Sequence, residues 1–168
     1  RIFAEEKATG TMEFLMTTPT SNTSIVLGKY LGSFLFFSLL LGITVLYYFI
    51  IEYFGQPDLW PVVTGFLGLW LEGGLFVAVG ILTSSWTRSQ VVAAMMSYVI
   101  LFLVYFSVSF IPYVPESFVP VIRHISTLTH AANFGVGLIS LADVVYYLSG
   151  IALCLVLTRI SVENRLWR

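Results

Sequence analysis

The chain has 168 residues, of which 58% are hydrophobic and 10% charged, and its mean hydropathy is +0.91. Because a soluble domain carries about 25% charged residues, this chain lacks the polar surface that would keep it in water. The net charge of −1 gives no indication of a nucleic-acid partner, and the single cysteine, Cys154, excludes a disulfide framework. The composition therefore predicts an integral membrane protein.

Residues 1–29 contain the most polar stretch of the chain, EEKATGTMEFLMTTP (residues 5–19). Apolar residues recur in it every three or four positions, which predicts an apolar stripe along a short helix: Ala4, Ala8, Met12, Leu15 and Met16. Gly10 weakens this helix and Pro19 ends it, and residues 20–23 then offer N-cap side chains for a helix leading through Lys29 into the membrane. From the residues alone, the segment is either an interfacial anchor or a docking surface for a cytosolic partner.

Four apolar runs are long enough to cross a membrane as helices: 30–54, 60–83, 91–113 and 144–160. Each has about 17–25 residues, the length that spans about 30 Å of hydrocarbon. A barrel would need alternating strands of about ten residues, and the sequence has no such pattern. We therefore expect one all-α transmembrane domain over residues 1–168. Gly28 and Gly32 have the spacing that packs a span against a neighbouring helix.

The longest connector, residues 114–143, joins the third and fourth spans. It has apolar residues at helical spacing, which predicts a short helix lying on or dipping into the outer leaflet: Val119, Ile122, Ile125 and Leu128. His124 and His130 are six positions apart and would lie on different faces of one helix. We interpret them as polar positions of this segment, and we expect no metal site.

The basic residues predict the orientation of the chain, because cytoplasmic loops carry an excess of Lys and Arg. Seven of the eight fall on one side of the four-span arrangement: Arg1, Lys7, Lys29, Arg88, Arg159, Arg165 and Arg168. Only Arg123 falls on the other side. Both ends of the chain and the Arg88 loop are therefore predicted to be cytoplasmic.

Glu72 lies near the middle of the second span, where an ionisable group costs at least about 2.5–3.5 kcal/mol. Gly65, Gly68 and Glu72 follow i, i+3, i+7 spacing, which places the acid on the small-residue face of its helix and points it into the bundle. Two interpretations stay open for these residues. Glu72 is either a neutral acid hydrogen-bonded within the helix packing, or a group of a translocation path.

The segment E-E-K-x-x-G-T-M-E-F-L-M-T-T-P followed by I-V-L-G-K-Y-L-G resembles the membrane subunit of type-2 ABC exporters. The stretches FVAVGILTSSWTRSQVVA (76–93) and DVVYYLSGIALCLVLTRISVENRLW (143–167) are similar to the gliding-motility branch of that family. The resemblance implies that residues 1–29 form a coupling helix and turn resting on an ATPase subunit, with contacts from Glu5, Glu6, Gly10, Thr11, Glu13, Leu15 and Pro19. It also implies a second permease subunit, a location in the bacterial inner membrane, and short re-entrant helices in the outer connector. Because the family has six spans, the chain would be a C-terminal part that lacks the first two.

The only Gly-Lys pair, Gly28-Lys29, is followed by Tyr30 and does not fit a phosphate-binding P-loop. Hydrolysis of ATP must then come from a separate subunit, and no cofactor is expected in this chain. The leading hypothesis is a permease of an ATP-driven exporter. Because its spans contain few polar residues, the expected cargo is amphiphilic or polymeric. The alternative is a non-transporting anchor or assembly subunit of a motility or secretion complex. An intramembrane enzyme comes third, because only Glu72 offers a reactive group within the spans.

Overall fold

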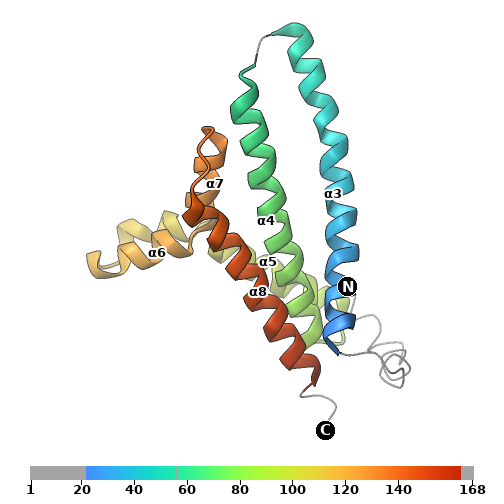
Figure 1. Cartoon of the computed structure of the whole chain (residues 1–168). Helices are drawn as coiled ribbons and strands as arrows, with labels where there is room; N and C mark the ends of the chain where they lie inside the picture. The colour runs from blue at the N-terminus through green and yellow to red at the C-terminus, as the bar shows by residue number, and fades with distance from the viewer. Residues whose placement is uncertain (1–21, 56, 164–168) are drawn as a thin grey trace.

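The computed structural model describes residues 22–55 and 57–163. These residues are helical, with no strand among them, and the elements follow one another in the order shown in Figure 1. The predicted coupling segment and the residues Glu5, Glu6, Gly10, Thr11, Glu13, Leu15 and Pro19 lie outside the described residues.

Three helices are long and apolar enough to cross a membrane: α3 (Asn22–Phe54), α4 (Leu59–Trp86) and α8 (Leu141–Glu163). They contain the predicted first, second and fourth spans, and each extends beyond the predicted bounds. The α3 helix begins eight residues earlier than the predicted span, so the segment around Lys29 continues directly into it. The fold is that of a helical membrane protein.

The predicted third span, 91–113, is bent rather than straight. Helix α5 (Gln90–Tyr105) is followed at once by the 3-10 helix η1 (Ser107–Tyr113), and the two axes differ by 56°. Pro112 lies inside η1 and has no N–H group to bond the carbonyl of Val108, so a regular α-helix cannot continue through this stretch. The described residues therefore contain three helices that could each span a membrane, or four such segments if the bent pair counts as one.

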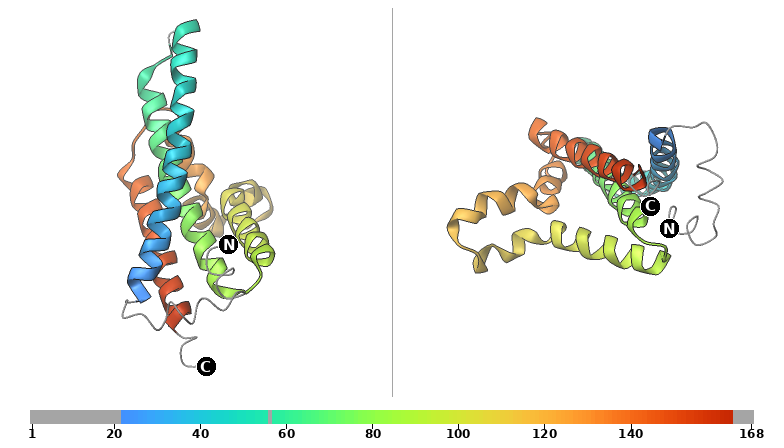
Figure 2. Two further views of the ribbon diagram at one scale, coloured as in Figure 1. Left: turned by 90° about the vertical axis from the view of Figure 1, so that its right-hand side faces the viewer. Right: turned by 90° about the horizontal axis from the view of Figure 1, so that it is seen from below.

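Seen along the bundle axis, α5 leads away from the packed helices α3, α4 and α8, and the connector returns to them (Figure 2, right). The connector contains η2 (Glu116–Phe118), α6 (Val119–Ile125) and α7 (Thr127–Gly135). Helix α6 points away from the bundle, whereas α7 packs against α4. The predicted single helix is thus two helices with different surroundings, divided at Ser126.

Helix α4 is the centre of the bundle and contacts α3, α5, α7 and α8. In its most apolar 18-residue window 56% of the residues are buried, against none in the window of α3. The exposed apolar side chains of α3 would face lipid, which has no cost in a membrane. The position of α4 makes it the element that holds the others together.

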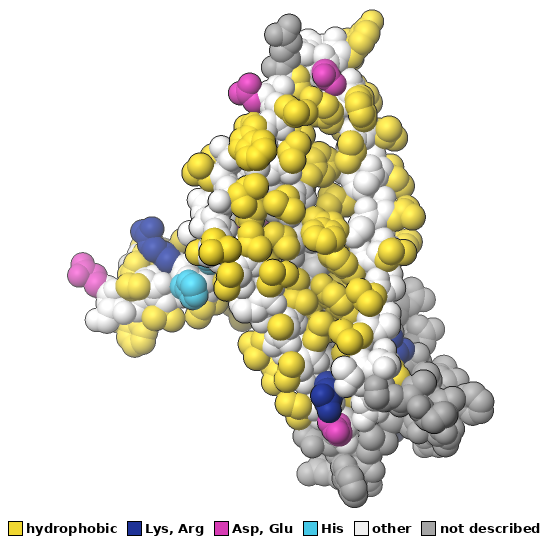
Figure 3. Space-filling view, viewed as in Figure 1, with side chains coloured by type: hydrophobic (Ala, Val, Ile, Leu, Met, Phe, Trp, Pro, Cys, Tyr) yellow, Lys and Arg dark blue, Asp and Glu magenta, His cyan; other side chains and the backbone are white. Residues whose placement is uncertain are grey.

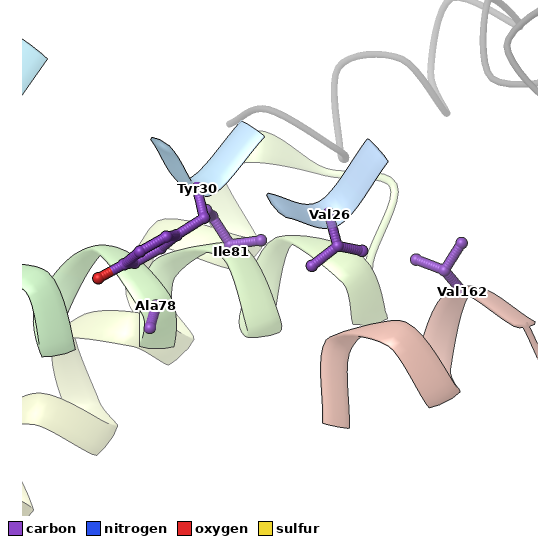
Figure 4. Close-up of a cluster of buried hydrophobic side chains, with 5 residues drawn as sticks. All are labelled: Val26, Tyr30, Ala78, Ile81 and Val162. Carbon is purple, nitrogen blue, oxygen red and sulfur yellow. The ribbon is translucent and has the colours of Figure 1, made fainter. Parts of the chain in front are cut away.

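One buried cluster joins three helices at the end of the bundle where α3 begins (Figure 4). Val26 and Tyr30 of α3 pack on Ala78 and Ile81 of α4, and Val162 of α8 completes the group. The first residues of α3, the turn between α4 and α5, and the end of α8 therefore lie at the same end of the molecule (Figure 1).

Candidate functional site

The predicted packing glycines differ in what surrounds them. A Cβ atom added to Gly28, Gly32 or Gly65 would meet nothing within 4 Å among the described residues. A Cβ atom on Gly68 would lie 2.6 Å from Cβ of Phe134, so only glycine admits this contact. Helix α7 thus packs closely against α4 at Gly68, whereas no described helix packs against α3 at Gly28 and Gly32.

Two further glycines, Gly73 and Gly74, form the close contact of α4 with α3. The ring of Phe37 occupies the place that a Cβ atom on Gly73 would take. A Cβ atom on Gly74 would lie 3.1 Å from both Phe34 and the hydroxyl of Tyr30. The sequence analysis missed this pair, although adjacent glycines inside a span are a recognisable signal of close helix approach.

Glu72 is buried in the bundle, with 8% of its surface exposed. It follows Leu71, which packs with Leu75, Phe134 and Tyr147 in the second buried cluster. The Oε1 atom of Glu72 is buried and has no hydrogen-bond partner among the described residues. The acid points into the bundle, and its packing leaves one oxygen unsatisfied.

A buried polar cluster that the sequence analysis did not foresee joins α7 to the first turn of α8. Nδ1 of His130 lies 2.6 Å from Oδ1 of Asp143, and Nε2 of His130 lies 3.0 Å from the backbone oxygen of His124. Asn133 donates from Nδ2 to the second carboxylate oxygen of Asp143 at 2.8 Å. His130 and Asp143 are 7% and 3% exposed, so both oxygens of a buried acid are bonded from α7.

The hydrogen bonds of His130 define where the protons of this cluster lie. Both neighbours of the ring, the Asp143 carboxyl and the His124 carbonyl, offer oxygen acceptors, so each contact needs a proton between its two atoms. The pair is therefore either imidazolium with carboxylate or imidazole with carboxylic acid. Both forms carry no net charge, which removes much of the cost of burying two ionisable groups.

Tyr146 extends the cluster to the end of α6. Its ring stacks on His130 with 4.0 Å between the ring centres, and its hydroxyl donates to the backbone oxygen of Ile125 at 2.6 Å. Since that proton is used, the hydroxyl of Thr127, 3.2 Å away, donates to the Tyr146 oxygen. One face of α8 thus holds the residues on both sides of the α6–α7 break.

The C-terminal end of α7 is held by α4 through two further hydrogen bonds. Thr64 donates to the backbone oxygen of Phe134 at 2.8 Å, and Trp60 donates from Nε1 to the backbone oxygen of Gly137 at 2.8 Å. Gly137 has a φ angle of 86°, a conformation that favours glycine, and Trp60 packs against it. Helix α7 is therefore fixed at one end by α8 and at the other by α4, although the buried hydroxyl of Thr129 on α7 has no hydrogen-bond partner among the described residues.

This arrangement holds helices together and does not offer catalysis. Both nitrogens of His130 are engaged, so the ring is not free to take a proton from a nucleophile. In the part of the chain that the structure describes, no group of three or more His, Cys, Asp and Glu is placed to hold a metal ion. The prediction that His124 and His130 lie on one helix is wrong, because Ser126 separates α6 from α7 and brings the two rings to 5.8 Å between centres.

Comparison with known families gives one match, to the family described as ABC-2 family transporter protein, over residues 1–161. Comparisons with curated proteins and with solved structures give no significant match. The matched range includes the opening segment 5–19, the predicted spans and the outer connector.

Proposed function

The chain belongs to the ABC-2 transporter family, which consists of membrane subunits of ABC transporters, and we propose that it couples ATP hydrolysis by a separate ATPase subunit to export of a substrate. The family match over residues 1–161 is the observation that carries this proposal. The protein is then a transport subunit and not itself a catalyst, and its partners are an ABC ATPase, a second permease subunit and the bilayer. The gliding-motility branch and a place in the bacterial inner membrane remain part of the proposal.

The opening segment, residues 5–19, is the proposed contact with the ATPase. It directly precedes α3, and the buried cluster at the start of α3 joins Val26 to Ile81 of α4 and Val162 of α8. A push on this segment would therefore act on three packed helices at once. Glu5, Glu6 and Glu13 would meet basic or amide groups of the ATPase, while Met12, Leu15 and Met16 would fill a groove.

The proposed orientation places the same end of the bundle in the cytoplasm. Lys29 lies near the start of α3, Arg88 in the turn after α4 and Arg159 near the end of α8. These three ends lie together (Figure 1), as the excess of Lys and Arg on the cytoplasmic side requires. The ATPase would then bind where the basic residues gather.

Charge reversal tests the proposed contact. The double substitution Glu6→Lys and Glu13→Lys in the full-length protein should release the ATPase during purification and lower its hydrolysis rate to that of the isolated subunit. Glu163→Lys is a matched control, because Glu163 is a half-exposed acid and the last residue of α8, which ends at the same end of the bundle (Figure 1), and it lies outside the segment. Membrane insertion should be unchanged in both variants.

Two results would contradict the proposal. If the double variant still co-purifies with the ATPase and transports, residues 5–19 are only an interfacial anchor. If the parent protein binds the ATPase but moves no substrate in any membrane assay, the chain is the anchor or assembly subunit of the alternative hypothesis.

A further inference from the structure

The outer half of the α3–α4 hairpin contains an apolar cleft that none of the described helices fills. Two adjoining grooves, open to one side and of about 390 and 290 Å³, lie along the helices and share Val45, Val63 and Phe66 as walls. Gly42 lines the larger groove, and a Cβ atom added there would meet nothing within 4 Å. The space-filling view shows apolar side chains along this part of the hairpin (Figure 3).

The length of the cleft matches one leaflet of a bilayer. Along α3 its walls run from Ser38 to Tyr48, and along α4 from Trp70 to Leu59. At 1.5 Å per residue each wall is about 15–17 Å long. The hydrocarbon core is about 30 Å thick, so one leaflet contributes about 15 Å. An extended acyl chain of the leaflet at the α3–α4 connection would lie along the whole cleft.

The walls offer no hydrogen bond to a polar ligand at the deep end. The hydroxyl of Ser38 donates to the backbone oxygen of Phe34 and accepts from Nε1 of Trp70, both at 2.8 Å. The remaining side chains of the cleft are apolar except for Tyr48 near its mouth. A hydrocarbon chain is therefore the ligand that can fill the cleft without leaving a polar group unpaired.

The mouth of the cleft carries negative charge. Leu41, Val45, Tyr48 and Glu52 follow one another at three- or four-residue spacing, so Glu52 continues the stripe of α3 that lines the cleft. Asp58 precedes Leu59 at the start of α4, and its side chain makes no capping hydrogen bond. Both acids are exposed, and the sequence has no Lys or Arg between Lys29 and Arg88. Figure 3 shows acidic side chains at this end of the hairpin.

We propose that the α3–α4 cleft binds a membrane phospholipid whose headgroup carries an ammonium group, such as phosphatidylethanolamine. One acyl chain fills the cleft from Tyr48 to Ser38, and the ammonium group lies between the carboxylates of Glu52 and Asp58. The charge of the mouth disfavours an anionic headgroup such as that of phosphatidylglycerol. The bound lipid completes the packing between α3 and α4 where their side chains do not meet.

The experiment measures retained lipid directly. The full-length protein is reconstituted in vesicles of equal parts phosphatidylethanolamine and phosphatidylglycerol with identical acyl chains, extracted in mild detergent and analysed by native mass spectrometry. The parent protein should retain phosphatidylethanolamine. Gly42→Phe should abolish this retention by filling the cleft, whereas Leu39→Phe, which adds the same ring at an exposed position of α3 outside the cleft, should not.

The headgroup is tested separately by the double substitution Glu52→Gln and Asp58→Asn. It should reduce the preference for phosphatidylethanolamine about twofold to fivefold, the effect of an exposed ion pair, and leave the acyl chain bound. In a variant whose only tryptophan is Trp70, bromine near the end of the acyl chain should quench fluorescence more than bromine near the headgroup.

Unchanged lipid retention in Gly42→Phe would overturn the proposal. If that variant instead changes the oligomeric state, the cleft belongs to a helix of another protein chain. Equal retention of the two lipids by the parent protein would overturn the role of Glu52 and Asp58.

Discussion

Removing the Asp143 carboxylate tests whether the polar cluster holds α7 in the bundle. In Asp143→Ala, Nδ1 of His130 loses its hydrogen-bond partner at 2.6 Å and Nδ2 of Asn133 loses its acceptor at 2.8 Å. Asp143 is 3% exposed, so water does not readily replace the lost carboxylate. The ring of His130 is then left either with a buried, unpaired charge or, when neutral, with Nδ1 as a buried acceptor without a donor.

The expected decrease in the free energy of unfolding follows from these contacts. A hydrogen bond to a charged group contributes about 1.5–3 kcal/mol, so two of them amount to about 3–6 kcal/mol. Breaking one partner of a buried ion pair costs about 3–5 kcal/mol in other proteins, which agrees. We therefore expect Asp143→Ala to lower the free energy of unfolding by about 3–5 kcal/mol.

A second ion pair, on the surface of α8, provides the control for this measurement. Arg159 and Glu163 form an exposed pair at 3.7 Å, with side chains about half exposed. Glu163→Ala should change the free energy of unfolding by no more than about 0.5 kcal/mol. Equilibrium unfolding of the purified protein by sodium dodecyl sulfate gives both values on the same scale.

A double-mutant cycle separates the pair from the rest of the cluster. Asp143→Ala and His130→Ala should be strongly non-additive, with a coupling energy of about 1–3 kcal/mol. Additive effects, or equal small effects of Asp143→Ala and Glu163→Ala, would refute the reasoning that the buried pair fixes α7.

Three further predictions concern the membrane-spanning helices. Gly68→Leu should destabilise the protein by about 1–3 kcal/mol in thermal unfolding, because the α7 phenyl ring occupies the added volume, whereas Gly65→Leu should change the melting temperature little. Glu72→Gln should insert and fold nearly as the parent does; loss of transport with normal expression would refute a purely structural role and favour the translocation path. Cysteines introduced at Ser89, which is exposed in the turn between α4 and α5, and at Asp58 should react with membrane-impermeant reagents from opposite sides, and labelling of both from outside would refute the proposed orientation.

The spans were predictable because their signal is local and strong. In α3, α4 and α8 the apolar runs are continuous and of bilayer length, and hydrophobicity alone defines them. The bend after Tyr105 was not predicted, since residues 90–113 are together apolar enough to form one span. Pro112 was the available signal, and its effect falls on the preceding turn, which belongs to the same predicted span.

The polar cluster could not be found in the same way. His130 and Asp143 are separated by 13 residues, a helix end and a turn at Gly137, and no spacing rule relates positions across such a break. Thr127, His130 and Phe134 do share the buried face of α7 at three- to four-residue spacing. That pattern indicates one buried face of a short helix, but it does not indicate which acid completes it.

The contacts show which of the described helices are held closely to one another and which are held more loosely. Helix α4 is bound closely to α3 at Gly73 and Gly74, to α7 at Gly68 and Thr64, and to α8 through both buried clusters. Polar bonds then tie α7 to α8, so these helices are held to one another by more than apolar contact. A change of shape that separated them would have to break buried hydrogen bonds, each costly in hydrocarbon.

Helix α5 is in a different position. Ala93 is its only buried residue, and it leads away from the packed helices before the bend into η1 (Figure 2). The turn between α4 and α5 lies at the end of the bundle where α3 begins, and the segment proposed to meet the ATPase precedes α3 in the sequence. Helix α5 is bound to α4 by the hydrogen bond between the hydroxyls of Thr83 and Ser97, at 2.6 Å. In a transporter that changes shape, moving α5 away from α4 would break this bond, whereas separating α4, α7 and α8 would break several, so we expect these three helices to move as one body.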